Sequence, residues 1–396
     1  MARGLVNKNA ALCALALITA EEILRRSRFC DFPFFESLCT AVMVLACGLA
    51  ACKIGVDLYN RKFSVRKLVV IAVGFCYTAF LIFRGQSDAF MVMWLFAVAL
   101  HDVEFEKIIK VSALSMFATL FMVYVCSAVG FIENTVKTRI REEEERNRNG
   151  MGFMEAYQAA YFLFFATLAW VYHRKEKLSW YEIVTLAAVN YIVFWQCDTR
   201  NPYYLSVVLL LIASVIKVLP QLREYLKWYT AAAILLPVIC AAVIIFQGAF
   251  ISPNSSEFIR ELSGRLSGRL MLNYEGVHQY GLSFLGKPIK WYIDYKNGHS
   301  YNWVDSVYLY SLLSYGVPFM LWFFAITTKL ALAAGKKKDT YMVIALVLIA
   351  ILGLWDNYCF RIECNPFYLF FAYEASVSAA EKPLEVGKDE ICKKCA

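Results

Sequence analysis

The feature that most constrains this chain is a series of apolar blocks, each close to 20 residues long, separated by short polar stretches. A helix needs about 20 apolar residues to cross the ~30 Å of hydrocarbon in a bilayer. Only helices and closed barrels satisfy their backbone polar groups there, and continuous apolar blocks favour helices over alternating strands. Charged residues make up 18% of the chain, whereas soluble proteins carry about a quarter. The sequence therefore predicts an all-α integral membrane protein with one polytopic domain over residues 1–396.

The lysines indicate how the blocks are oriented. Lysine and arginine in short loops concentrate on the cytoplasmic side, and with the N-terminus inside most lysines fall in inner loops and in a cytoplasmic tail at residues 381–396. Both termini are therefore predicted to be cytoplasmic. The prediction comprises about twelve transmembrane helices, at residues 9–24, 37–56, 68–83, 88–103, 107–132, 152–172, 179–196, 201–219, 228–249, 303–328, 340–356 and 364–380.

Most arginines, in contrast, fall outside on this topology. A guanidinium binds phosphate through a planar, bidentate fork, so the outer face is predicted to bind a phosphate-bearing ligand. The alternative is drift in loop composition.

Two of the outer loops are long. Residues 133–149 carry Glu and Arg pairs four apart, which predicts a solvated surface helix. Residues 250–302 form a large extracytoplasmic loop with six Lys or Arg against four Asp or Glu. We expect the second loop to carry the function, because it is the longest polar interruption in the chain.

A repeated Leu-Ser-Gly-Arg lies at residues 262–269 of this loop. If the repeat is helical, Arg265 and Arg269 share one face, where like charges four apart repel each other. Its two glycines each weaken a helix by ~1 kcal/mol relative to alanine. An anion such as a pyrophosphate between the arginines would explain why the sequence tolerates both the charge repulsion and the weakened helix. The alternative is a basic segment that lies on lipid headgroups.

Aromatic and titratable residues follow the repeat. Trp291, Trp303 and Tyr308 could stack on sugar faces, although aromatic residues near span ends usually form an interfacial belt. Asp305 lies just inside a predicted span, where a carboxylate is costly and therefore a functional candidate. His278 is a second candidate base, the alternative being a solvated loop histidine.

Other chemistries lack their motifs in this chain. It has no P-loop, no Gly-x-Gly-x-x-Gly after a strand, no His-Glu-x-x-His, no Gly-x-Ser-x-Gly and no Asp-x-Asp. We therefore expect no cofactor, no metal and no nucleic-acid partner. Charged residues within the apolar blocks are few, which speaks against a proton-coupled transporter.

Three motifs follow one another in this region: Leu-Ser-Gly-Arg-Leu at 266–270, then Gly281 and Gly286, then Val-Asp-Ser-Val-Tyr-Leu-Tyr-Ser-Leu-Leu-Ser-Tyr-Gly at 304–316. Their order resembles the bacterial oligosaccharide repeat-unit polymerases (Wzy-like proteins) of O-antigen, capsule and exopolysaccharide assembly, which are related to the O-antigen ligases. The resemblance covers roughly residues 100–320. Upstream, Arg200 precedes a long apolar helix as in the family, and Arg148 precedes Gly152-Phe153, where Met154-Glu155-Ala156 replaces the family's His-Pro-Asn.

The resemblance implies a polymerase of the GT-C-like polymerase/ligase architecture on the outer face of the bacterial cytoplasmic membrane. Such an enzyme transfers a growing glycan from undecaprenyl pyrophosphate to another lipid-linked repeat unit, without metal or nucleotide sugar. Its partners would be the lipid-linked oligosaccharide, membrane lipid, a flippase and a chain-length regulator. The implied roles are pyrophosphate binding for Arg148, Arg200, Arg265 and Arg269, general base for Asp305 or His278, and sugar binding for Trp291, Trp303 and Tyr308.

Two alternatives stay open from the sequence. One is an O-antigen-type ligase or another lipid-carrier-dependent glycosyltransferase, which handles the donor in the same way. The other is a non-catalytic transporter or flippase of the lipid-linked repeat unit.

Overall fold

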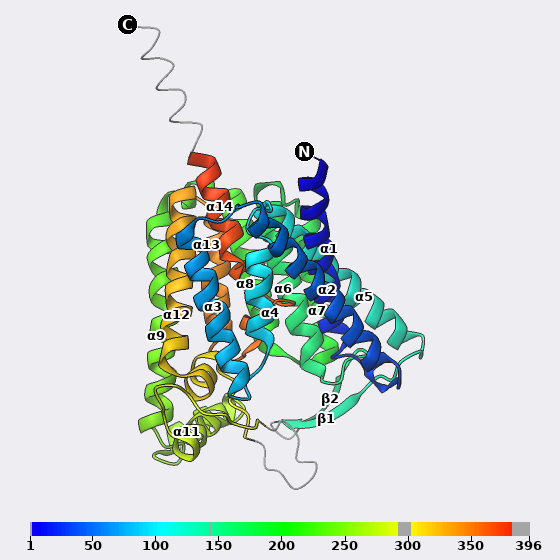
Figure 1. Ribbon diagram of the computed structural model, residues 1–396. Helices are drawn as coiled ribbons and strands as arrows, with labels where there is room; N and C mark the ends of the chain where they lie inside the picture. Colours follow the sequence, from blue (N-terminus) through cyan, green and yellow to red (C-terminus); the bar gives the residue numbers. More distant parts are fainter. Residues whose placement is uncertain (1, 142–143, 292–301, 382–396) are drawn as a thin grey trace, which may run out of the picture.

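A computed structural model describes residues 2–141, 144–291 and 302–381 of the chain. The chain is 76% helical, and most helices run between two ends of an elongated bundle (Figure 1). Helix α1 begins and α14 ends at one end, which we call the terminal end. The strands β1 and β2 and the helix α11 lie at the other, which we call the loop end. The predicted tail at 381–396 lies outside the described residues, apart from Glu381.

Each predicted apolar block overlaps one helix. Six of the described helices are long and apolar enough to cross a membrane: α2, α3, α5, α8, α9 with the turn before it, and α12. The bundle helices are α1 (Ala2–Leu24), α2 (Phe35–Tyr59), α3 (Val65–Phe83), α4 (Ala89–Ala99), α5 (Phe105–Ala128), α6 (Ala156–Arg174), α7 (Trp180–Cys197), α8 (Arg200–Val218), α9 (Leu226–Phe250), α12 (Val307–Lys337), α13 (Thr340–Leu352) and α14 (Phe370–Glu381).

Three of the predicted spans do not match a membrane-length helix. Helices α4, α13 and α14 have 11, 13 and 12 residues, so at ~1.5 Å per residue each reaches less than about 20 Å. Helix α4 ends at a turn around His101, and α13 ends at Gly353. Apolar composition alone did not reveal these ends, because the residues beyond them are buried as well.

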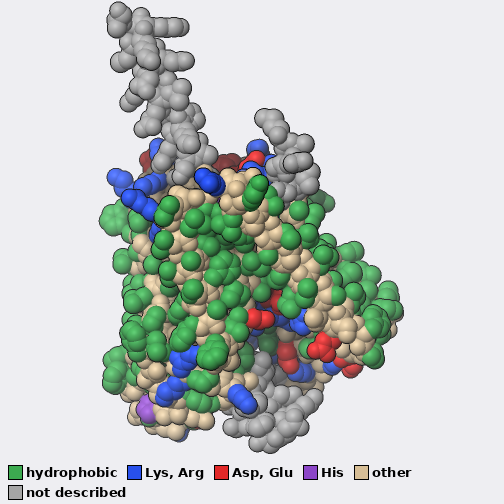
Figure 2. Space-filling view, viewed as in Figure 1, with side chains coloured by type: hydrophobic (Ala, Val, Ile, Leu, Met, Phe, Trp, Pro, Cys, Tyr) green, Lys and Arg blue, Asp and Glu red, His purple; other side chains and the backbone are tan. Residues whose placement is uncertain are grey.

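Helix α6 lies at the centre of the bundle. Nearly all of its side chains are buried, and it packs against α5, α7, α8 and α13. Helices α2, α3, α7 and α9 instead expose large apolar side chains on their outer faces, which give the molecule a largely apolar flank (Figure 2). This pattern of an apolar exterior around a buried core is what a lipid environment requires.

An irregular stretch at residues 353–369 connects α13 to α14, and we call it the buried segment. Most of its residues are buried, although they form only two short 3-10 turns, at Tyr358–Phe360 and Pro366–Tyr368. Side chains satisfy part of its backbone, as the amide of Asn365 donates to the Cys359 carbonyl at 2.7 Å. Irregular backbone within a membrane protein is tolerated where protein encloses it or it lines a wet cavity. The two spans predicted for this region, at 340–356 and 364–380, are therefore only partly helical, because the buried segment replaces the end of the first and the start of the second.

The described residues of the stretch at 133–149, which was predicted to lie outside, form a pair of antiparallel strands, so the predicted surface helix is wrong. Strand β1 (Val136–Arg141) pairs antiparallel with β2 (Glu144–Asn149). The Thr138 hydroxyl donates to the Asn147 amide oxygen at 3.0 Å across the pair. Pairs four apart add only ~0.2–0.5 kcal/mol to a helix, whereas Val136, Thr138 and Ile140 alternate as β-branched residues do in strands.

Candidate functional site

The Leu-Ser-Gly-Arg repeat is broken by a turn in the structure. Helix α10 (Glu257–Arg265) ends at the first arginine, and α11 (Arg269–Tyr280) begins at the second. Ser267 and Gly268 between them have φ angles of 59° and 78°, the left-handed conformation that glycine adopts without penalty. The two arginines therefore do not share a helical face, and the predicted paired site is wrong.

The two arginines have different surroundings. Arg265 is 74% exposed and forms an ion pair with Glu261 at 2.7 Å on the surface of α10. Arg269 turns inward, and its Nε donates to Oδ2 of Asp305 at 2.8 Å. Arg269 and Asp305 keep only 25% and 24% of their side chains exposed. The structure thus joins the two predicted residues Arg269 and Asp305 and leaves Arg265 outside.

A second carboxylate lies close to this pair. Asp356 of the buried segment is within electrostatic range of both Asp305 and Arg269, and its Oδ1 accepts a hydrogen bond from the Tyr358 backbone N–H at 2.8 Å. Burial, reinforced by the negative charge of Asp305, raises the pKa of Asp356 to about 7, although the Tyr358 N–H, Tyr161 and Arg269 favour its ionised form.

Asp305 is perturbed in the same direction. Burial raises its pKa above the ordinary value, and the charge and hydrogen bond of Arg269 oppose this change. With a pKa of about 7, Asp356 can both accept and release a proton near neutral pH, which is the property a general acid or base needs.

The start of α12 is held in place by two glycines. Gly286 and Gly316 have φ angles of 70° and 82°, and a Cβ on either would come under 3.0 Å from backbone of the other's segment. Their close approach allows Val317 N–H to donate to the Phe284 carbonyl and Lys287 N–H to the Leu313 carbonyl, both at 2.8 Å. Gly286 is one of the glycines that carried the resemblance, and its role is this close backbone contact.

Side chains of the turn between α3 and α4 form hydrogen bonds with the same region. Arg84 donates to the carbonyls of Leu285 and Gly286 at 2.7 and 3.0 Å. Gln86 donates to the carbonyls of Lys287 and Ser314 at 2.8 and 3.0 Å. These bonds tie α12 to the segment before it, and Asp305 lies two residues before α12 begins.

Two of the three predicted sugar-binding aromatics lie together. The rings of Trp291 and Trp303 are 6.3 Å apart, and both pack on Tyr310. Trp291 also donates to the Ser314 hydroxyl at 3.1 Å. Both tryptophans are partly exposed, so they can present a ring face to a ligand, and Trp303 lies two residues from Asp305.

Tyr308 does not belong to this group. Its side chain is buried with 1% exposed, and its hydroxyl donates to the Ala350 carbonyl at 2.7 Å. It joins α12 to α13, so the predicted sugar contact is wrong.

His278 lies away from the Asp305 site. It follows Arg269 by nine residues on α11, which turns it about 180° around the helix axis. Its ring stacks on Tyr274 at the surface, with centroids 3.9 Å apart, and its Nδ1 lies 2.9 Å from the Tyr274 carbonyl. The structure therefore favours the solvated loop histidine and leaves Asp305 as the candidate base.

The remaining predicted arginines meet at the start of α8. Arg148 of β2 donates to the Cys197 carbonyl at 2.9 Å and to the Thr199 hydroxyl at 3.0 Å. Arg200 is the first residue of α8, and Thr199 gives this helix no side-chain cap. Among the described residues neither arginine has a carboxylate partner within ion-pair distance, whereas Asp198 lies 3.8 Å from Arg146. Uncompensated cations at a helix N-terminus favour an anion.

Several buried charged residues were not predicted from the sequence. Asp356 and Glu363 lie in the buried segment, and Glu21 lies near the end of α1. Glu21 lies in the first predicted span and Asp356 ends the eleventh, whereas Glu363 lies between two predicted spans. Isolated acidic residues in apolar surroundings are candidates by default, and this signal could have identified Asp356 and Glu363.

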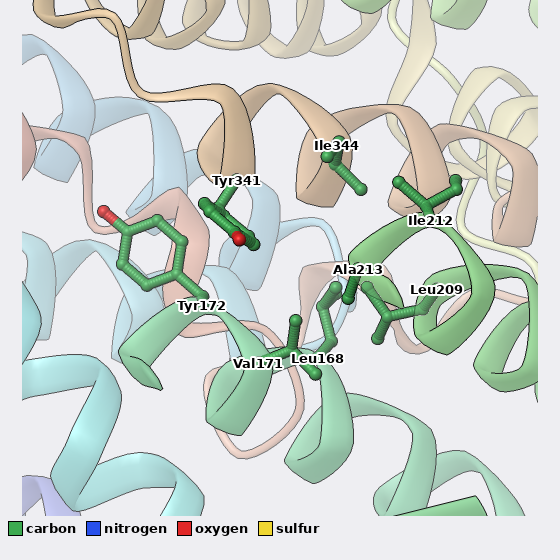
Figure 3. Close-up of a pocket in the computed structure, with 8 residues that line it drawn as sticks. All are labelled: Leu168, Val171, Tyr172, Leu209, Ile212, Ala213, Tyr341 and Ile344. Atoms are coloured by element: carbon green, nitrogen blue, oxygen red, sulfur yellow. The ribbon is translucent and has the colours of Figure 1, made fainter. Parts of the chain in front are cut away.

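Two cavities among the described residues are apolar and small. The one drawn in Figure 3 lies between α6, α8 and α13 and has room for about 10 Å³, the size of one water molecule. Another, of about 20 Å³, lies between α4, α12 and the buried segment. Neither can hold a sugar. The first is lined by Leu168, Val171, Tyr172, Leu209, Ile212, Ala213, Tyr341 and Ile344.

One group of metal-ligating residues lies near the terminal end. Ligand atoms of Asp57, His101 and Asp102 lie within 4.8 Å of one another. The ammonium groups of Lys53 and Lys62 contact both aspartates, with Lys53 2.7 Å from Asp102 and Lys62 2.6 Å from Asp57. These lysines occupy the carboxylate oxygens that a metal would need, so the cluster is an ion-pair network.

Comparison with protein-family models, with curated proteins and with solved structures finds no match to this chain.

Proposed function

We propose that this protein is a membrane glycosyltransferase that polymerises lipid-pyrophosphate-linked oligosaccharide repeat units at the loop end of the bundle. The observation that supports this most is the Arg269–Asp305 pair with Asp356 beside it. It combines a fixed cation, a half-buried carboxylate and a carboxyl group with a pKa of about 7. The resemblance of the surrounding motifs to the oligosaccharide polymerases supplies the substrate class.

In the proposed reaction, Asp305 accepts the proton of a hydroxyl group on the acceptor sugar. The hydroxyl oxygen forms a bond to the anomeric carbon of the donor glycan. The bond between that carbon and the pyrophosphate oxygen breaks, and the lipid pyrophosphate leaves with the electron pair. Arg269 favours the ionised form of Asp305, and Asp356 can pass the proton on because its pKa lies near neutral pH.

The negative charge that develops on the leaving group needs donors that are already in place. Arg148 and Arg200 at the N-terminus of α8 supply two guanidinium groups and uncapped backbone N–H groups. Arg265 has no part in this proposal because it is exposed and paired with Glu261. Trp291 and Trp303 would hold the sugar rings.

The proposal also sets a location and partners. The loop end would face outward from a bacterial cytoplasmic membrane, with the terminal end in the cytoplasm. A flippase would supply the lipid-linked repeat units there, and a chain-length regulator would act on the product.

The test uses purified protein in detergent with a lipid-pyrophosphate-linked repeat unit and a chelator, without nucleotide sugar. We expect a ladder of longer products. Arg269→Gln and Asp305→Asn should abolish the ladder, whereas Arg265→Gln, from the same repeat, should retain it. Full activity of both Arg269→Gln and Arg200→Ala would contradict the electrostatic mechanism.

A ligase would handle the donor in the same way and differ in the acceptor. Glycan analysis in a deletion strain separates the two reactions. Loss of a polymerase leaves single repeat units on the final acceptor, whereas loss of a ligase leaves full chains on the lipid carrier.

One observation favours a transporter of the lipid-linked repeat unit as a second candidate. Glu22 and Glu363 share one guanidinium nitrogen of Arg26 inside the bundle, at 3.4 and 3.1 Å, and such buried carboxylates occur in proton-coupled transporters. Protein reconstituted in liposomes distinguishes the activities. Movement of the lipid-linked unit across the bilayer under a proton gradient, with no ladder, would replace the polymerase with a transporter.

A further inference from the structure

A second charged cluster lies beside the Asp305 site, where the end of α1 meets the buried segment. Arg26 binds Glu22 and Glu363 through the same nitrogen, and its guanidinium lies 5.8 Å from the ring centre of Tyr358. Arg25 is paired with Glu21. The cluster joins residues 337 positions apart in the chain, and the proposed reaction uses none of them.

The acidic residues of the cluster lie near α2 and near the start of α4. Glu21 and Glu22 lie within electrostatic range of the thiols of Cys39 and Cys47 on α2, and Cys47 is also within range of Asp88, just before α4. Figure 2 shows acidic and basic side chains in a hollow midway down an otherwise apolar flank. Charged groups on a flank that contacts lipid are costly unless water or a polar ligand reaches them.

Arg361 is the residue of this cluster whose donors are least used. Its side chain is 32% exposed, and its nearest carboxylate oxygen, on Glu363, is 3.6 Å away, beyond hydrogen-bond distance. It donates no side-chain hydrogen bond within the described part of the chain, and its guanidinium lies over the Tyr358 ring at 5.5 Å. Glu363 is held more closely by Arg26, at 3.1 Å.

The charge of Arg361 is poorly balanced as a result. Burial raises the pKa of Glu363 above its ordinary value, whereas Arg26 favours its charged form. A guanidinium with five donors in a planar fork and no carboxylate within hydrogen-bond distance suits a phosphate group.

We propose that Arg361, in the cluster next to α2, binds the phosphate head of a membrane lipid whose apolar chain extends sideways into the bilayer. The exposed apolar side chains of α2 at Leu38, Val44 and Leu45 provide the surface along which that chain would lie. This inference rests on the proposed function, in which the lipid is one of the two lipid-linked glycans that the reaction joins. The other would be held by Arg148, Arg200 and Arg269 at the loop end.

The experiment counts lipids on the purified full-length protein by native mass spectrometry, with undecaprenyl pyrophosphate as the probe. We expect two bound molecules per chain. Arg361→Gln should remove one of them and weaken that site about ten- to a hundredfold, because it removes charge-assisted hydrogen bonds. Arg361→Lys should lose less. Arg265→Gln is the matched control and should bind as the wild type does, and melting curves of all variants establish that they fold.

Three outcomes would overturn the inference. Arg361→Gln could retain both lipids, or the wild type could bind a single lipid that only Arg269→Gln removes. Inorganic pyrophosphate could occupy the Arg361 site as tightly as the lipid, which would make it a free-anion site. A photoreactive analogue of the lipid locates the chain, and crosslinks are expected at residues 35–47 of α2. Because these readouts measure binding alone, they are independent of whether the protein forms a ladder.

Discussion

Replacing Asp356 with asparagine should change how the stability of this protein depends on pH. The pKa of Asp356 is raised from 3.8 to about 7 by burial and by Asp305. Between these two values the folded protein holds a proton that the unfolded chain has released. The free energy of unfolding of the wild type therefore decreases as pH rises from about 4 to about 7, and this contribution is constant outside that window. Asp356→Asn removes it, because the amide does not titrate.

The magnitude follows from the size of the shift. A change of about three pKa units corresponds to roughly 4 kcal/mol at 1.36 kcal/mol per unit. Relative to the wild type, Asp356→Asn should thus gain up to roughly 4 kcal/mol between pH 4 and pH 8. Asp305→Asn removes the neighbouring negative charge, lowers the folded-state pKa of Asp356 and should therefore bring down the upper end of this pH window.

The assay is thermal unfolding in detergent at a series of pH values from 4 to 8. The wild-type Tm should fall over this range more steeply than that of Asp356→Asn. Asp31→Asn is the control, since Asp31 is 48% exposed and pairs with Arg28 at the surface, and its curve should parallel that of the wild type. Parallel curves for Asp356→Asn and the wild type would refute the assignment of a neutral-range proton to Asp356.

Three further substitutions test the geometry around the site. Gly286→Ala should destabilise the protein by roughly 2 kcal/mol or more, because alanine is strained at a φ of 70° and its Cβ would collide with the Ser314 backbone; an unchanged Tm would contradict this. Tyr308→Phe should lower the free energy of unfolding by about 1 kcal/mol, because the hydrogen bond to the Ala350 carbonyl is lost. A raised KM with an unchanged Tm would instead indicate that Tyr308 binds the sugar. His278→Ala should leave the product ladder and its pH profile unchanged, since His278 lies on the opposite face of α11 from Arg269; loss of the ladder would return it as a base.

The sequence by itself predicted a helical membrane protein, because block length and continuity of apolar residues are local properties. It also singled out Arg269 by its place in the Leu-Ser-Gly-Arg repeat and Asp305 by its place at the start of a predicted span, whereas Arg148 and Arg200 came from the resemblance to the oligosaccharide polymerases. The structure brings the first two together at 2.8 Å. Predictions from helical periodicity were less accurate where the backbone changes direction. Gly268, with its left-handed backbone, lies in the turn that separates Arg265 from Arg269 and prevents them from sharing a helical face.

Which of these charged residues form ion pairs depends on the tertiary structure. Arg269 and Asp305 are 36 residues apart, Arg26 and Glu363 are 337 apart, and no local pattern encodes such pairings. Asp356 is the last residue of one predicted span and Glu363 directly precedes the next, yet the chain there forms an irregular segment enclosed by its neighbours. Backbone that is not helical can persist inside the bundle only when surrounding side chains and helices satisfy its polar groups. Those partners come from distant parts of the chain, so the candidate site exists only once the helices have packed.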